Sequence, residues 1–322
     1  TVNIVYADAT QGWIPLDDDV VADVPSPPPT QKAIFAFGWT GAYTAISNLV
    51  NSSGVVASDT SGVGTARYGP GAAGYGVDKA IFAYGTSGPR VSTSNLVSNS
   101  GVVGSDVTGV GTVRYALAAA GYGGDKAIFG YGDPYDSSVS MTNLVSNAGV
   151  VATDTTGVGT ARRFLAATPY GGDKALFGYG RSGDPGLSMT NLVSTSGVVA
   201  TDTTGVGTGR YGLAAATYGG DGRAIFGFGQ PFDGGPTPKT AITNLVSSSG
   251  VVSADVAGVG TIRDTIAAAP YGGDKAIFGF GNSSGVTGIT NLVSSSGVVA
   301  SDTSAVGSAR SNTAGAGYST SA

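Results

Sequence analysis

A segment of about 48 residues recurs six times along the 322-residue chain, and this repetition constrains the fold more than any other feature. Each copy contains an apolar run such as GGDKAIFGYG at 123–132, followed by Asn-Leu-Val, Gly-Val-Val and Arg. A phosphate-binding loop is needed once, so a lysine-glycine segment found six times indicates architecture rather than a nucleotide site. The Asn stands at 48, 95, 143, 191, 244 and 291, and the Arg at 67, 114, 162, 210, 263 and 310.

One unit can be divided into short strands and glycine turns. We expect strands over 115–122, 126–131, 142–146 and 150–155, with a hairpin at 123–125 whose glycines adopt positive φ. The second of these runs is apolar on both faces, which is typical of a sheet covered on both sides. The alanine-rich first run suits an innermost position, where the units crowd around an axis. Four short strands at this period predict an all-β fold, a six-bladed β-propeller of four-stranded blades. A stacked solenoid is the alternative, but the polar caps that it requires are not found.

The unit contains, in this order, Arg114, Tyr115, Ala118 to Ala120, Asp125, Lys126, Gly130 and Gly132. This order resembles the kelch repeat, which implies a propeller but no particular function. Two features depart from that family: Gly-Tyr-Gly replaces the adjacent glycine pair, and Val150 and Val151 stand where a Trp is expected in the fourth strand. The repeats of the chromosome-condensation-regulator family are a weaker match and also build propellers.

The incomplete first and last copies of the repeat predict how the sheet edges are paired. The first unit begins at Lys32 with its second strand, and residues 310–318 are an unmatched copy of the first strand. Pairing the two would leave no open sheet edge, so we expect the C-terminal strand beside 32–38 and a closed ring. The propeller would then span 32–318, followed by a C-terminal tail at 319–322.

Residues 1–31 differ from the repeats and are expected to form a tether. The proline-rich stretch before Gln31 should act as a stiff, extended linker. The β-forming residues before it, around Tyr6, Trp13 and Ile14, could pair with another virion or cell-surface protein by strand addition. The run ADATQGWIP at 7–15 resembles short segments of tailed-phage virion proteins.

The composition excludes several kinds of chemistry. All 21 acidic residues are Asp, while Glu, His and Cys are absent. The chain therefore lacks the commonest general base, thiol catalysis, disulfides and zinc–thiolate sites. A net charge of −5 argues against a nucleic-acid partner, and no apolar run approaches the roughly 20 residues that a membrane helix needs. We expect a non-enzymatic protein with no cofactor, no metal site and no membrane insertion.

The motifs that could suggest an enzyme have simpler interpretations. GVG at 62–64 and at four later positions resembles a dinucleotide fingerprint, but no helix follows, so we interpret it as a turn. Asp133 and Asp136, in the loop DPYD, are the nearest approach to a glycosidase carboxylate pair. We expect a solvated turn there; calcium, which prefers six to eight oxygens, is the alternative. The Asp that stands eight residues before each repeated Arg is expected to pair with that Arg, or to form part of a ligand-binding ring.

The loops between the second and third strands are the candidate recognition surface. From the strand-start Lys or Arg to the Asn, the units measure 16, 16, 17, 17, 21 and 16 residues, so the length variation lies in these loops. All six loops should lie at one end of the molecule, and Trp39, Tyr135 and Phe232 should be exposed there. Variable loops on a rigid scaffold are typical of binding surfaces, although drift in unselected loops is the alternative. The candidate binding residues are Trp39, Tyr43, Arg90, Asp133, Tyr135, Asp136, Arg181, Phe232 and Lys239.

These features lead to one functional expectation and one alternative. We expect a structural and recognition protein at the surface of a phage virion, on the capsid or a tail fibre, and held by residues 1–31. The alternative is a secreted, extracellular bacterial lectin or adhesin that binds glycans through one propeller face. A glycan-cleaving enzyme ranks third.

Overall fold

The computed structural model describes residues 30–135, 137–183, 185–232 and 238–321, and the backbone of 4–8 and 12–15. The repeat forms an antiparallel sheet whose central strand is β9 (Lys126–Gly130), between β8 (Ala118–Tyr122) and β10 (Thr142–Val145). The predicted hairpin between β8 and β9 is confirmed, with φ of 60° at Gly123 and 80° at Gly124. We call the end of each sheet that bears this hairpin the hairpin end. The opposite end, where Ala118 and Thr142 both pair with Gly130, is the loop end.

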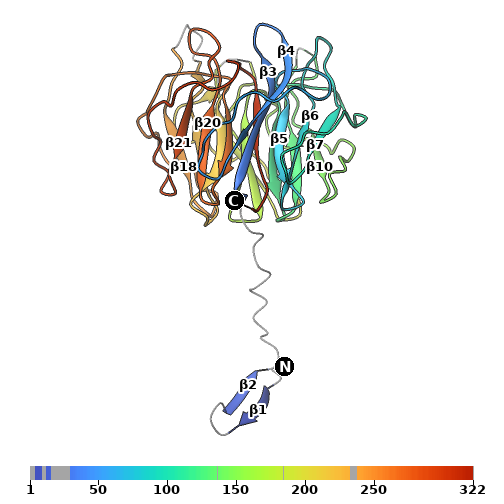
Figure 1. Ribbon diagram of the computed structural model, residues 1–322, viewed down its shortest axis with the longest axis vertical. Coiled ribbons are helices and arrows are strands. Elements are labelled where there is room, and N and C mark those ends of the chain that lie inside the picture. The colour runs from blue at the N-terminus through green and yellow to red at the C-terminus, as the bar shows by residue number, and fades with distance from the viewer. Residues whose placement is uncertain are drawn as a thin grey trace.

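The described residues contain six sheets of this kind, and their strands run between the same two ends of the molecule (Figure 1). The first strands are β5 (Gly71–Tyr75), β8, β11 (Ala166–Tyr170), β15 (Ala214–Tyr218), β19 (Ala267–Tyr271) and β22 (Ala314–Tyr318). The central strands are β3 (Lys32–Trp39), β6 (Lys79–Ala83), β9, β12 (Lys174–Gly178), β16 (Arg223–Gly227) and β20 (Lys275–Gly279). The third strands are β4 (Tyr43–Val50), β7 (Ser94–Val97), β10, β13 (Thr190–Val193), β18 (Thr243–Val246) and β21 (Thr290–Val293).

Two further pairs of strands complete the described elements. β1 (Ile4–Asp8) pairs with β2 (Gly12–Pro15), and β14 (Arg210–Tyr211) pairs with β17 (Gln230–Pro231).

The segment expected as a fourth strand, 150–155, does not form one. It makes two isolated bridges, Val145 to Val151 and Thr142 to Thr155, whose registers differ by one residue. The amide of Asn143 lies between them and donates to the carbonyl oxygen of Ala152 at 3.0 Å. A side chain therefore takes the place of a regular ladder bond, so each sheet has three strands rather than four. The expected first strand is also shorter, because β8 begins at Ala118 rather than at Tyr115.

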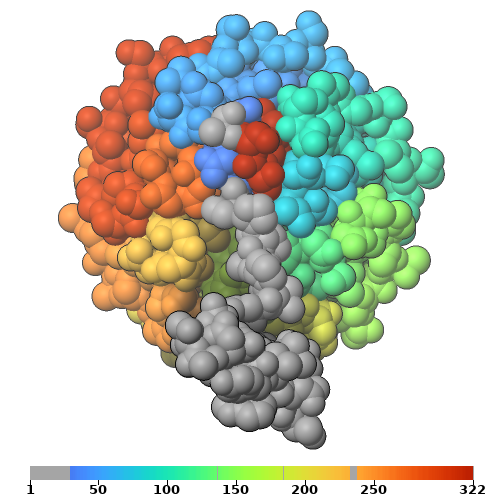
Figure 2. Space-filling view, turned by 60° about the horizontal axis from the view of Figure 1, so that its bottom comes forward, coloured from blue at the N-terminus to red at the C-terminus, as the bar shows by residue number. Residues whose placement is uncertain are grey.

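The C-terminal strand pairs with the first unit, as the incomplete first and last copies of the repeat predict. β22 runs antiparallel to β3, with Ala314 opposite Ala36 and Tyr318 opposite Lys32. The units follow one another around a common centre in sequence order, and the red C-terminal residues lie beside the blue first unit (Figure 2). A central cavity of about 210 Å³ is lined by residues from β5, β8, β11, β15, β19 and β22. The alanine-rich strands are therefore the innermost ones.

Backbone hydrogen bonds join neighbouring sheets at the hairpin end. The N–H of Gly123 donates to the carbonyl oxygen of Asp173 in the next sheet at 2.7 Å. In the sheet that contains the C-terminus, the N–H of Ser319 donates in the same way to Asp78 at 2.8 Å. The other bonds of this series run from Gly76 to Asp125, from Gly171 to Gly222, from Gly219 to Asp274 and from Gly272 to Gln31.

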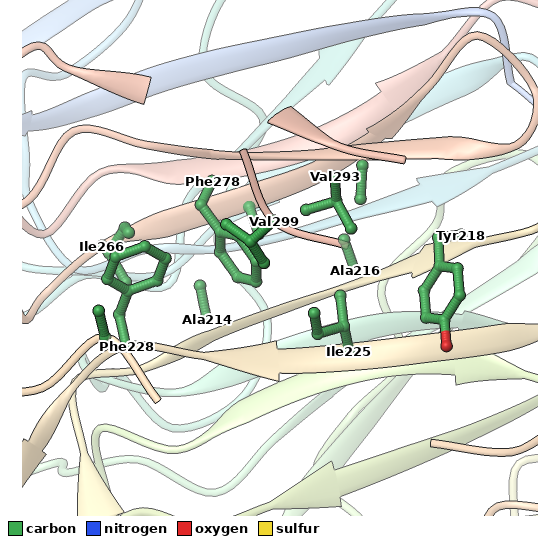
Figure 3. Packing of buried hydrophobic residues seen from close by; sticks show 12 residues of the cluster. Ala214, Ala216, Tyr218, Ile225, Phe228, Ile266, Phe278, Val293 and Val299 are labelled. Carbon is green, nitrogen blue, oxygen red and sulfur yellow. The ribbon is translucent and has the colours of Figure 1, made fainter. Parts of the chain in front are cut away.

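The hydrophobic core lies between the faces of adjacent sheets. In Figure 3, Ile225 and Phe228, which lie in and beyond β16, approach Phe278 of β20 and Val293 of β21. Ile225, Phe228, Phe278 and Val293 are fully buried, because each central strand is covered on both sides. This accounts for the continuous apolar runs in the sequence.

Each repeated Arg is buried at the joint between two sheets. The guanidinium of Arg114 lies 4.3 Å from the ring centre of Tyr84, which belongs to the preceding sheet. Within its own sheet it donates to the Oδ1 of Asn143 at 2.5 Å and lies 3.7 Å from the Oδ1 of Asp154. The expected pairing of Asp154 with Arg162, eight residues later, is therefore wrong. The seven intervening residues lead to the next sheet, whereas the pairing of strands within one sheet brings Arg114 back beside Asp154.

Asp154 also holds the connection that arrives from the preceding sheet. Its carboxylate accepts from the backbone N–H of Thr112 at 3.0 Å and from the Thr112 hydroxyl at 2.6 Å. Gly111, the last glycine of a GVG run, has φ of 74°, and a Cβ there would collide with Asp154 and Asn143. The GVG runs are thus turns that make room for a carboxylate.

We expect Gly111→Ala to lower the free energy of unfolding by about 1–3 kcal/mol, because alanine is strained at this φ and would displace Asp154. The matched control is Gly285→Ala, where an added Cβ meets nothing within 4 Å and φ is not positive. It should change stability by no more than about 0.5 kcal/mol. Chemical denaturation measures both variants, and equal effects would contradict the proposed role of Gly111.

The joint carboxylates also predict acid sensitivity. Desolvation alone would raise the pKa of Asp154, but hydrogen bonds from Thr112 and Asn143 and the charge of Arg114 outweigh it and lower the pKa. A carboxyl group whose pKa is lowered on folding stabilises the fold above its unfolded value, about 3.9, and loses that contribution as pH falls through the folded value. The pKa is lowered in the same way at Asp59, Asp106, Asp202, Asp255 and Asp302.

The melting temperature should therefore be nearly constant between about pH 7 and 5 and fall steeply below about pH 4. With no His or Glu in the chain, aspartates dominate the titration in this range. Calorimetry across this range tests the expectation, and an unchanged melting temperature at pH 2.5 would contradict it.

Candidate functional site

The loop end is organised by residues with left-handed backbone. Ala116 and Phe164 have φ of 55° and 52°, and each lies just before the first strand of its sheet. The N–H of Phe164 donates to the carbonyl of Ala116 at 2.8 Å, and that of Ala116 donates to Gly69 at 3.1 Å. These bonds bring the residues just after the repeated Arg of neighbouring sheets side by side.

Seven aromatic rings lie in contact across the loop end, and we call them the aromatic arc. Tyr68 stacks on Tyr43 with ring centres 5.6 Å apart, and Tyr115 meets Tyr68 edge-on at 5.9 Å. Phe164 continues the arc 5.8 Å from Tyr115. All seven rings are at least partly exposed. The members are Trp39, Tyr43, Tyr68, Tyr115, Phe164, Tyr211 and Phe232.

Sequence reasoning identified only Trp39, Tyr43 and Phe232 of this arc. Tyr68 and Tyr115 directly follow a repeated Arg, so their shared position in the repeat could have identified them. From the sequence, however, Tyr115 is predicted to begin the first strand rather than to lie at a surface.

Arginines from the loops lie on these rings. The guanidinium of Arg90 is 4.9 Å from the ring centre of Tyr115 and 4.8 Å from that of Tyr135. The guanidinium of Arg181 is 4.5 Å from Tyr211 and 5.4 Å from Phe164. Such contacts are favourable by about 0.5–2 kcal/mol each, depending on solvent exposure. They place cationic groups on the faces of the rings.

Asp133 is the anionic centre of this cluster rather than part of a solvated turn. Its side chain is only 1% exposed, so that expectation is wrong. Its carboxylate lies 3.0 Å from the Nη2 of Arg90 and also pairs with the Nη1 of Arg163. Backbone bonds between Asp133 and Tyr115 hold it at the start of the loop. Asp136, its expected partner, lies outside the described residues.

The ammonium group of Lys239 is held by contacts within the protein. Its Nζ lies 3.0 Å from the Oδ1 of Asp264 and donates to the carbonyl oxygens of Asn282 and Ser283, at 2.8 Å each. The ammonium thus links the longest loop to the next sheet. It has little remaining capacity for a ligand.

Exposure differs among the three aromatic residues expected to be accessible. Tyr135 is 61% exposed. Trp39 and Phe232 are half-buried, because Trp39 packs edge-on against Tyr43 at 5.1 Å and Phe232 against Tyr211 at 6.4 Å. All three lie at the loop end, as expected.

The phenol of Tyr68 remains neutral at physiological pH. Burial raises the pKa of Tyr68, the neighbouring Tyr115 and Tyr43 raise it further, and Arg90 opposes the change.

The tether residues lie in the β1–β2 hairpin, where Tyr6 pairs with Trp13 and Val5 with Ile14. Among the residues that the structure describes, no group of three or more acidic, His or Cys side chains could hold a metal ion. The same part of the chain contains no helix long and apolar enough to cross a membrane.

No protein-family model matches the chain, and no curated protein matches it. The kelch resemblance is therefore not supported by a family match. The structure supports the repeat itself: units of about 48 residues, each with a three-stranded antiparallel sheet and an Arg, an Asn and an Asp at its joint.

Proposed function

We propose that the six sheets form a closed six-bladed β-propeller. The pairing of β22 with β3, the backbone bonds between successive sheets and the shared central cavity support this architecture. In each blade the segment after the third strand, held by isolated bridges, takes the place of the fourth strand.

On this scaffold, the protein is a non-enzymatic recognition module that is attached at one end and binds at the other. The observation that carries the proposal is the position of Thr30 and Gln31, where the chain enters the repeats. Gln31 bonds to Ser319 and Gly272, and Thr30 bonds to Gly273, all at the hairpin end beside the cavity. The aromatic arc occupies the opposite end. A tether on one face leaves the other face free to meet a ligand.

The N-terminal arm is the attachment segment, and its virion-like run at 7–15 favours the surface of a phage particle over a free secreted lectin. A two-stranded hairpin is only marginally stable alone, so β1–β2 is suited to pairing with a partner protein.

Deletion of residues 1–29 tests the attachment. This variant keeps Thr30 and Gln31 and their bonds, so its melting temperature should match that of the full chain, while its incorporation into particles should be lost. Immunodetection in purified particles measures incorporation. A large fall in melting temperature would assign the arm to the folded core, and normal incorporation would reject the tether.

Tyr135→Ala tests the binding end. Tyr135 is the most exposed aromatic residue there, and binding to host cells should fall about fivefold to thirtyfold without loss of stability. Lys174→Ala is the matched control at the hairpin end, where Lys174 is 43% exposed and, within the described part of the chain, forms an ion pair only with its neighbour Asp173. If Lys174→Ala reduces cell binding and Tyr135→Ala does not, the hairpin end rather than the loop end binds the host cell.

A further inference from the structure

The first unit differs from the other five in the length of its strands. Its central strand β3 and its third strand β4 each contain eight residues, whereas the equivalent strands of the other sheets contain five and four. The added length lies at the loop end, where Gly38 pairs with Thr44 and Trp39 with Tyr43. In the other units, the described residues show only isolated bridges between the second and third strands at this level. The longest sheet is therefore the one through which the chain enters the repeats.

Strand β3 crosses the molecule from the point of entry to the proposed binding surface. At the hairpin end it follows Gln31, whose N–H donates to Ser319 at 2.7 Å and whose carbonyl oxygen accepts from Gly272 at 3.0 Å. At the loop end it finishes at Trp39, a ring of the aromatic arc, which packs on Tyr43 at the start of β4. One extended strand thus joins the end of the tether to the arc.

A load on the attached protein would run along this strand. A ligand held at the loop end and a tether held at the hairpin end pull in opposite directions, and the strands run between these two ends (Figure 1). In an antiparallel sheet, the backbone hydrogen bonds lie perpendicular to the strands. Tension along β3 therefore shears its hydrogen bonds together, rather than opening them one after another from an end.

Neighbouring strands hold β3 on both sides against such a load. β22 pairs with it from Lys32 to Ala36, and β4 pairs with it from Ala33 to Trp39. Because β3 is central in its sheet, it can slide only if both ladders break at once.

Side chains of the C-terminal segment add to these ladders. The hydroxyl of Thr313 donates to the carbonyl oxygen of Ala36 at 2.9 Å, and the Nε of Arg310 donates to that of Phe37 at 3.0 Å. The hydroxyl bond is specific to the sheet that carries the tether, because the equivalent residues of the other five units have no hydroxyl group. These residues are Pro70, Leu117, Leu165, Leu213 and Ile266.

We propose that the first sheet is a load-bearing clamp, in which tension between a bound surface and the tether is carried along β3 and resisted in shear by β22 and β4. This inference rests on the proposed attachment and recognition functions, and it assigns a mechanical role to the sheet that joins them.

Single-molecule force spectroscopy on the full chain tests the clamp. One handle is fixed at the N-terminus and the other at an introduced cysteine, which is unique because the chain contains no Cys. Ser284→Cys places the second handle on an exposed residue of the loop end, so that β3 is sheared. Lys174→Cys places it at the hairpin end, on a side chain that is 43% exposed, so that β3 is peeled away sideways.

At the same loading rate, the first unfolding event in the shear geometry should need at least about twofold more force than in the peeling geometry. The physical reason is that forced unfolding follows the barrier to unfolding, and this barrier is higher when the hydrogen bonds of β3 must break together. Equal forces, or a larger force in the peeling geometry, would overturn the clamp.

Thr313→Val identifies a bond that carries the load. Valine is nearly the same size but cannot donate to Ala36, so unfolding under constant load in the shear geometry should become about threefold to tenfold faster, the effect of one hydrogen bond. Thr86→Val is the matched control, because it removes a hydroxyl bond of 3.0 Å to Gly88 in the neighbouring sheet, away from β3. It should leave the rate unchanged. Equal acceleration by the two variants would show that the resistance reflects general stability rather than the clamp.

The outcomes separate the clamp from the functions on which it rests. If deletion of residues 1–29 abolishes incorporation into particles but the shear and peeling forces are equal, the attachment stands and the clamp is wrong. If the shear force is higher but the deletion leaves incorporation normal, no load reaches β3 through the tether. The mechanical role is then rejected together with the attachment.

Discussion

A chain that ends at Val306 is expected to lose its cooperative unfolding transition. The missing residues include all of β22, which pairs along β3 from Ala314 to Tyr318. Without it, the inner edge of β3 is exposed and the first unit retains only two strands. Sheet edges without a partner promote aggregation, so the truncated chain should also be less soluble.

The same truncation removes the joint between the first and last units. Arg310 lies 3.9 Å from the ring centre of Phe280 and donates to the carbonyl oxygen of Phe37 at 3.0 Å. Ser308 donates to Asp59 through its backbone N–H, at 3.0 Å, and through its hydroxyl, at 2.6 Å. A chain that ends at Ser319 keeps all of these contacts and serves as the control. Calorimetry should show one sharp transition for the control and a broad, weak one for the truncated chain. Full cooperative stability after truncation would show that the ring is not closed through β22.

Arg114→Ala is expected to have the largest effect of any single substitution considered, about 3–5 kcal/mol of destabilisation. It removes a fully buried guanidinium, so the Oδ1 of Asn143 loses its donor and Asp154 loses its cationic partner. The packing of the guanidinium on Tyr84 is also lost, so two neighbouring sheets should separate more easily.

Denaturant titration measures this loss. Lys126→Ala is the control, because its side chain is 44% exposed and its contact with Asp125, at 3.4 Å, contributes less than about 1 kcal/mol. A loss below that level for Arg114→Ala would mean that the joint arginines do not hold the sheets together. Arg114→Lys should recover little, because lysine cannot stack on Tyr84 and reach Asn143 at the same time.

Several local features could be read from the sequence because they depend on neighbouring residues. The hairpin at 123–125 follows from two glycines that can adopt positive φ, and the covered strand 126–130 follows from its unbroken apolar run. One long-range pairing, that of the C-terminal strand with β3, could also be predicted, because it followed from counting strands and avoiding an open edge.

The errors came from features that depend on contacts distant along the chain. A fourth strand was expected from the pattern of short runs and glycine turns, but the Asn143 side chain occupies the position of a ladder bond. Asp133 was expected in solvent because DPYD has turn composition, but arginines from two other segments cover it. Nothing in the spacing of Arg90 or Arg163 indicates that either would reach Asp133.

The sequence by itself determined the period, the all-β character, the order of strands in each unit and the end at which the variable loops lie. These properties follow from a repeat of about 48 residues, from glycine turns and from strand alternation. Only the tertiary structure decided that Arg114 pairs with Asp154 rather than Arg162 with Asp154, and that Tyr68, Tyr115 and Phe164 form a continuous arc. The physical reason is that residues close in the sequence can belong to neighbouring sheets, as Asp154 and Arg162 do. The pairing of strands within one sheet, in contrast, brings Arg114 and Asp154 together although they are far apart in the sequence.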